Sequence, residues 1–86
     1  MSERGGVEAG PALFNPELSG VEGPLEKLSF EELLAALERV TSRLASGELG
    51  IEVAADLYEQ AEILHAAAQA RLAAVEARIE RMRAQP

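Results

Sequence analysis

The chain has 86 residues, enough for one small domain with a limited core, so a partner or an oligomer is a serious expectation for its stability. Its formal net charge of −7 and sequence pI near 4.6 argue against direct nucleic-acid binding, because that affinity comes largely from Lys and Arg. With no cysteine and one histidine, the chain offers no disulfide framework or thiolate zinc site and little for imidazole chemistry, so we expect no cofactor and no metal.

Residues 1–24 form an acidic extension rich in glycine and proline. They hold five of the seven glycines and three of the four prolines of the chain. A segment of this composition buries too little apolar surface to offset its ordering entropy, so we expect residues 1–24 to be disordered. The alternative within this segment is a short docking motif formed by Leu13 and Phe14, which precede the turn favoured by Asn15-Pro16.

No part of the chain is typical of an export signal or a membrane span. The N-terminal residues MSERGGVEAG lack an apolar core, and the longest apolar run, ILHAAAQA, is ended by Arg71. The absence of cysteine fits a reducing compartment. We therefore expect a cytoplasmic protein that makes no membrane contact.

From residue 25 onward Ala, Leu, Glu and Arg dominate, and we assign residues 25–86 to one helical domain. Ser29, followed three residues later by Glu32, matches a capping box that begins a helix over residues 30–46. Gly47 is the expected stop. Apolar residues recur along this helix at alternating spacings of three and four, which lays one stripe along it: Phe30, Leu33, Leu37, Val40 and Leu44.

A short turn over residues 47–50 leads into a second helix over residues 51–83. Helices joined by so few residues run antiparallel as neighbours, so the pattern predicts an all-α, coiled-coil-like two-helix hairpin whose second helix is longer. The second apolar stripe contains Ala54, Leu57, Ala61, Leu64, Ala68, Leu72, Val75, Ile79 and Met82. We expect the hairpin seam to consist of Phe30, Leu33, Leu37, Val40, Leu44, Leu57 and Leu64.

The two expected helices differ in length, and the difference leaves part of the second stripe uncovered. At about 1.5 Å per residue the first is roughly 25 Å long and the second roughly 50 Å. If the two helices are paired residue by residue from the turn, Leu44 lies beside Ala54 and Phe30 near Ala68. The first helix begins at Phe30, so it does not reach past Ala68. We call the four apolar residues beyond that point the distal stripe: Leu72, Val75, Ile79 and Met82.

We expect the distal stripe to be a docking surface for another copy of the chain or for a helix of a larger protein. The alternative is intramolecular: Leu25, Leu28 and Val21 fold back and cover it. Acid-base or metal chemistry at the paired carboxylates, such as Glu31-Glu32, is not expected, because a two-helix hairpin has no walled pocket that shifts their pKa values. The arginines near the C-terminus match the helix macrodipole and lack a neighbouring aromatic residue to stack a base.

A set of short motifs resembles the small subunit of exodeoxyribonuclease VII. They are Leu28-Ser29-Phe30-Glu31-Glu32, Leu37-Glu38, Leu44, Ser46-Gly47-Glu48-Leu49 and Leu57-Tyr58-Glu59, and the resemblance covers residues 25–82. Each motif alone is weak, and their order and separation make the set specific. Two positions depart from the family pattern: Gly50 stands where proline is usual, and Gln60-Ala61 replaces the usual glycine.

The resemblance implies a noncatalytic helical subunit of a bacterial nuclease that degrades single-stranded DNA from both ends into oligonucleotides. It also implies that a large subunit carries the DNA-binding and hydrolytic sites and that several small subunits attach to its long helical region. Two alternatives stay open: a self-associating helical-hairpin adaptor unrelated to nucleases, and an independent small enzyme.

Overall fold

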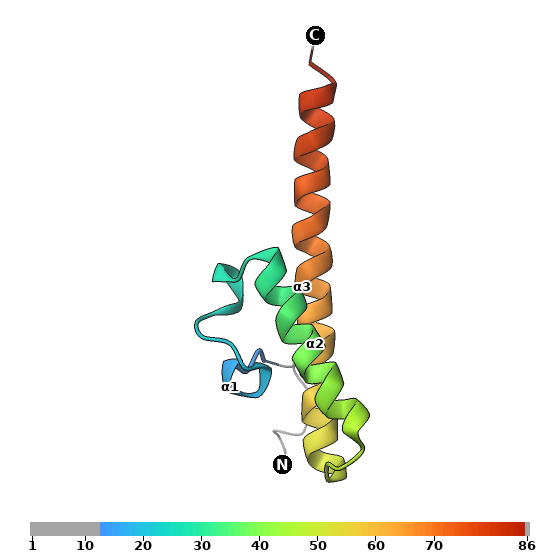
Figure 1. The fold of residues 1–86 in the computed structure, drawn as a ribbon. Helices are drawn as coiled ribbons and strands as arrows, with labels where there is room; N and C mark the ends of the chain where they lie inside the picture. Colours follow the sequence, from blue (N-terminus) through green and yellow to red (C-terminus); the bar gives the residue numbers. More distant parts are fainter. Residues whose placement is uncertain (1–12, 86) are drawn as a thin grey trace, which may run out of the picture.

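The computed structural model describes residues 13–85, and all regular structure among them is helical, with no strand. A short helix α1 (Pro16–Ser19) and a 3-10 turn η2 (Leu25–Lys27) precede two longer helices, α2 (Phe30–Ser46) and α3 (Ile51–Arg83). Figure 1 shows α2 lying along the first half of α3, while the second half of α3 continues alone to the C-terminal end. The expected all-helical class is therefore confirmed for the described residues.

The ends of α2 are set by local side-chain and backbone chemistry. The Ser29 hydroxyl accepts a hydrogen bond from the Glu32 N–H at 3.0 Å, and the Glu32 carboxylate accepts one from the Ser29 N–H at 2.8 Å. Gly47 ends the helix in the left-handed region with φ of 73°. The helix thus starts and stops at the residues that the sequence marks, and Gly50 serves as the N-cap of α3.

Loss of the capping box should weaken the fold modestly. We expect Ser29→Ala to lower the free energy of unfolding by about 1 kcal/mol, because the Glu32 N–H in the first turn of α2 loses its hydrogen-bond acceptor. Urea denaturation followed by circular dichroism measures the change. Ser42→Ala, an exposed serine within the same helix, is the control and should stay close to the unsubstituted chain. Equal losses for the two variants would contradict a capping role for Ser29.

The core is a narrow seam between α2 and α3. Leu33, Leu57 and Leu64 are fully buried and Val40 is 1% exposed. Phe30, Leu37 and Leu44 are partly buried and contact this cluster. Two alanines, Ala36 and Ala68, complete the buried set together with Leu28. Small side chains at these positions let the two helix backbones approach each other closely.

The structure differs from the sequence expectation for part of the N-terminal extension. Residues 1–12 lie outside the described residues, but residues 13–24 carry α1 and contact both long helices. Phe14, Leu18 and Val21 lie partly buried against the core cluster. Their burial depends on packing against α2 and α3, which the composition of residues 1–24 by itself does not indicate.

The short helix α1 is fixed by hydrogen bonds at both of its ends. The Asn15 side chain accepts from the N–H groups of Glu17 and Leu18 at 2.9 and 3.2 Å. After the helix, the Arg39 guanidinium donates to the Gly20 carbonyl at 2.9 Å. Gly20 has φ of 71°, a conformation that favours glycine, and a Cβ there would lie 2.9 Å from the Arg39 Nε and would displace that side chain.

A buried glutamine of α3 holds the α1 segment in place. Gln60 is 3% exposed, and its Oε1 accepts hydrogen bonds from the Asn15 N–H at 2.8 Å and the Ser19 hydroxyl at 3.2 Å. Its Nε2 donates to the Leu13 carbonyl at 2.9 Å. Ser19 is itself buried, at 1% exposure. One side chain therefore satisfies three groups from a segment more than forty positions away.

Removing this side chain should release the α1 segment. We expect Gln60→Ala to lower the free energy of unfolding by about 1 to 3 kcal/mol, because it leaves partly buried polar groups without partners. Urea denaturation measures the loss, and amide exchange at Asn15 shows whether the segment detaches. Gln69→Ala, an exposed glutamine on the same helix, is the matched control. Equal stability of the two variants would show that Gln60 does not hold α1.

Candidate interaction surface

The distal stripe is the largest group of exposed apolar side chains on α3. Leu72, Val75 and Ile79 are 44%, 42% and 46% exposed, and Met82 is 66% exposed. Leu57 and Leu64, on the same helix, are fully buried. Leu57 and Leu64 are therefore buried where α2 packs against α3, whereas the distal stripe, beyond the start of α2, is exposed.

The distal stripe lies on the same face of α3 as the buried seam. Val75 follows Leu64 by eleven residues and Leu57 by eighteen, which correspond to about three and five helical turns at about 3.6 residues per turn. The face that α2 covers in the first half of α3 therefore continues into the second half. Figure 1 shows that, among residues 13–85, no other helix runs along the end of α3 beyond the start of α2, and the side chains of the distal stripe are exposed there.

The intramolecular alternative is only partly realised. Leu28 is buried, and Leu25 and Val21 contact the core, as that alternative requires. Arg71 donates a hydrogen bond to the Leu28 carbonyl, which fixes the start of α2 against α3. The side chains of the distal stripe nevertheless remain 42% to 66% exposed, so within the described part of the chain residues 13–28 do not cover them.

Apart from the distal stripe, a groove lies between α2 and α3. Its lining residues are Leu37, Thr41, Ala61, Glu62, His65, Ala66 and Gln69. His65 and Tyr58, which the sequence places at the edge of the apolar stripe, are both exposed. The groove is lined by three apolar residues, Leu37, Ala61 and Ala66, and by four polar ones.

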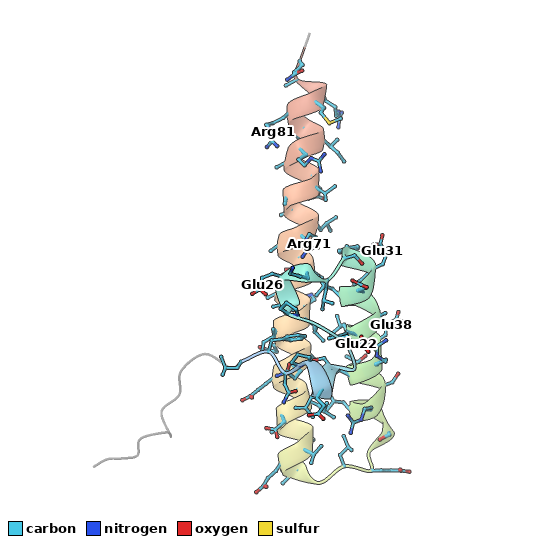
Figure 2. All side chains as sticks on the ribbon, turned by 90° about the vertical axis from the view of Figure 1, so that its left-hand side faces the viewer. Glu22, Glu26, Glu31, Glu38, Arg71 and Arg81 are labelled. Atoms are coloured by element: carbon cyan, nitrogen blue, oxygen red, sulfur yellow. The ribbon has the colours of Figure 1, made fainter. Side chains whose placement is uncertain are left out.

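The charged side chains of residues 13–85 are mostly exposed and form no cluster suited to holding a metal ion. Glu31 and Glu32 are exposed in the first turn of α2, and no group of three or more His, Asp or Glu side chains in the described part is placed to hold a metal ion. Arg83 and Glu80 form an ion pair at 3.4 Å, with about three quarters of each side chain exposed, so it contributes little to stability. Figure 2 shows Glu31 and Glu38 of α2 and Arg81 of α3 pointing away from the opposite helix.

The structure adds buried residues to the expected seam, of which only Ala68 lies on the apolar stripe expected from the sequence. Ala36 and Ala68 are at helical spacing from the seam leucines, and their periodicity is detectable in the sequence. Gln60 lies between Leu57 and Leu64 at the spacing of a seam residue, but a search for apolar side chains does not select it because it is polar. Ser19 gives no local signal, because its burial depends on α1 docking against Gln60.

None of the helices among the described residues is long and apolar enough to cross a membrane.

Comparison with known proteins identifies relatives of the helical part of the chain. The family model described as Exonuclease VII small subunit matches residues 30–81. A protein of Novosphingobium aromaticivorans named Exodeoxyribonuclease 7 small subunit is 48% identical over 61 residues, which cover 71% of this chain and 74% of that protein. The matched range contains α2 and nearly all of α3. It includes Leu72, Val75 and Ile79 of the distal stripe and ends one position before Met82.

Two further relatives carry the same name. The protein of Rhizobium leguminosarum bv. trifolii is 37% identical over 68 residues, covering 79% of this chain and 74% of its own length. The protein of Caulobacter vibrioides is 36% identical over 58 residues, covering 67% of this chain and 69% of its own length. No solved structure matches the chain.

Proposed function

The chain belongs to the exonuclease VII small subunit family, and from that membership we propose that it is the noncatalytic subunit of an exodeoxyribonuclease VII complex. It binds the large catalytic subunit and supports exonucleolytic degradation of single-stranded DNA to oligonucleotides. Several copies bind each complex, in the cytoplasm. The phosphodiester hydrolase is then the assembly, and the large subunit supplies both the DNA-binding and the hydrolytic residues.

The distal stripe is the observation that carries this proposal. Four large apolar side chains stay exposed on the helix face that, nearer its start, carries the buried Leu57 and Leu64. Full burial of each would contribute on the order of 1.5 to 3 kcal/mol, which is a strong driving force for association. We take Leu72, Val75, Ile79 and Met82 as the contacts with the large subunit.

An antiparallel hairpin of α2 and α3 is the scaffold that presents this surface. The four residues between the helices and the shared core of Val40, Leu57 and Leu64 support that arrangement. In Figure 1 the chain runs down α2 and back up α3. We propose residues 25–86 as the helical domain, with residues 13–24 as an extension docked on it.

The surface charge supports a subunit that leaves DNA to its partner. The chain carries a formal net charge of −7, and the first half of α3 has Glu52, Asp56, Glu59 and Glu62 without a basic residue. Such a surface repels phosphates. A noncatalytic chain that binds protein is consistent with exposed carboxylates and with an apolar face that lacks a walled pocket.

Co-expression with the large subunit encoded in the same genome tests the proposal. Gel filtration should show one complex, and degradation of single-stranded DNA should be faster with this chain present than with the large subunit alone. The chain alone should release no nucleotides. Separate elution with unchanged nuclease activity would contradict the proposal, and turnover by the chain alone would contradict its noncatalytic role.

A self-associating hairpin adaptor is the second candidate, because the exposed distal stripe would also be buried between copies. Sedimentation of the isolated chain distinguishes the two. A stable oligomer that does not exchange with the large subunit would favour the adaptor.

A further inference from the structure

The two halves of α3 carry opposite charge. Residues 51–62 contain only acidic charged side chains, whereas residues 63–85 contain four arginines and two glutamates. The basic side chains that flank the distal stripe are Arg71 and Arg78 on one edge, seven residues apart. The other edge carries Glu76 and Arg83. Among the residues of α3 itself the first edge is therefore basic and the second is mixed, and Glu26 of η2 lines one surface with Arg71.

Arg78 is the outer charge of the basic edge. Arg71 is half-buried and donates to the Leu28 carbonyl, next to η2, which brings Glu26 to the same level of α3 (Figure 2). Arg78 is exposed two turns further along the helix. Figure 2 shows Arg81 on the side of α3 that faces away from α2, so it lies off the stripe. Two arginines three residues apart thus differ in whether a helix on the stripe would meet them.

This arrangement disfavours a second copy as the occupant. In an antiparallel pairing of two distal stripes, Val75 of one copy would oppose Ile79 of the other, and the twofold axis would pass near residue 77. Arg78 would then face Arg78, and Glu76 would face Glu76, which is repulsive on both edges. A parallel pairing would bring the two α2 helices against each other, because α2 occupies the same face of α3.

The geometry points to an acidic amphipathic helix of the large subunit as the occupant of the distal stripe. This inference rests on the proposed function and adds the chemistry and placement of the partner segment. The occupant lies in line with α2, beyond its first residue, and extends the seam with its own apolar residues. Its edge facing Arg71 and Arg78 carries carboxylates, which form charge-assisted contacts with the two guanidinium groups.

Charge reversal at one edge tests the inference. We compare Arg78→Glu with Arg81→Glu, which makes the same change in net charge on the exposed outer side of the same half of α3. The affinity of each full-length variant for the co-expressed large subunit is measured by titration at two salt concentrations. Arg78→Glu should weaken binding by about tenfold or more and reduce its salt dependence, whereas Arg81→Glu should bind like the unsubstituted chain.

The possible outcomes separate this inference from the proposed function. If the unsubstituted chain forms no complex, both fail. If it forms a complex and the two variants bind equally well, only the acidic helix is overturned. If the isolated chain sediments as a dimer that Arg78→Glu dissociates, the occupant is a second copy and the inference is overturned. Circular dichroism of both variants confirms that neither substitution unfolds α3.

Discussion

Replacing Val75 and Ile79 together with Asp is expected to abolish the complex with the large subunit while leaving far-UV helicity mostly intact. Both side chains are more than 40% exposed in the free chain, so the substitutions cost little there. In the complex each carboxylate would be buried in an apolar interface, where an unpaired charge is strongly unfavourable. Gel filtration of the co-expressed proteins and circular dichroism of the purified chain measure the two effects.

The double variant Ala73→Asp with Ala77→Asp is the matched control. It adds the same two charges to the same half of α3, at exposed positions on the opposite face of the helix. This control should keep the complex. Loss of helicity in the Val75 and Ile79 variant would contradict the account, because it would make these positions part of the core of the free chain.

Replacing Leu64 with Ala should destabilise the isolated chain by about 2 to 5 kcal/mol, because it leaves a cavity at the centre of the seam. Leu64 is fully buried between α2 and α3. In a domain of this size such a loss is a large part of the total stability and should lower the Tm by roughly 10 °C or more. Thermal denaturation followed by circular dichroism measures it.

Leu72→Ala is the control for this substitution, since it removes the same atoms from the same helix at a site that is 44% exposed. It should cost less than half as much in the isolated chain. It should nevertheless weaken the complex, because we propose Leu72 as a contact with the large subunit. Equal losses of stability for the two variants would show that the seam and the distal stripe are not distinct in the free chain.

The long helices and most of the seam could be predicted from the sequence because their signals are local and periodic. The capping box at Ser29 and Glu32 and the glycine at position 47 mark the ends of α2 through contacts between near neighbours in the chain. The alternating spacing of Leu33, Val40 and the other apolar residues identifies the face that is buried. Such patterns need no knowledge of the rest of the fold.

The docking of α1 could not be predicted in the same way. Gln60 contacts Leu13, Asn15 and Ser19 across more than forty positions, and none of these residues carries a local signal of burial. Composition indicated that residues 13–24 cannot form a core by themselves. It could not indicate that Phe14 and Leu18 would find one on the surface of α2 and α3.

The distal stripe could be predicted only in part from the sequence. Its apolar residues recur with the same period as those of the seam, so the sequence identifies one apolar face along the whole of α3. The period alone does not show which part of this face is buried and which part is exposed. The division comes from the length of α2, which begins at Phe30 and leaves the four side chains of the distal stripe 42% to 66% exposed. We propose that a partner outside the chain covers them.

Amide hydrogen exchange along α3 is the most direct test of the claim that the distal stripe binds the large subunit. In the free chain, amides of residues 72–82 should exchange much faster than those near Leu57 and Leu64, because no packed neighbour opposes local opening. In the complex, residues 72–82 should become strongly protected. Protection confined to α2 or to the first half of α3, with residues 72–82 still exchanging fast, would contradict the account.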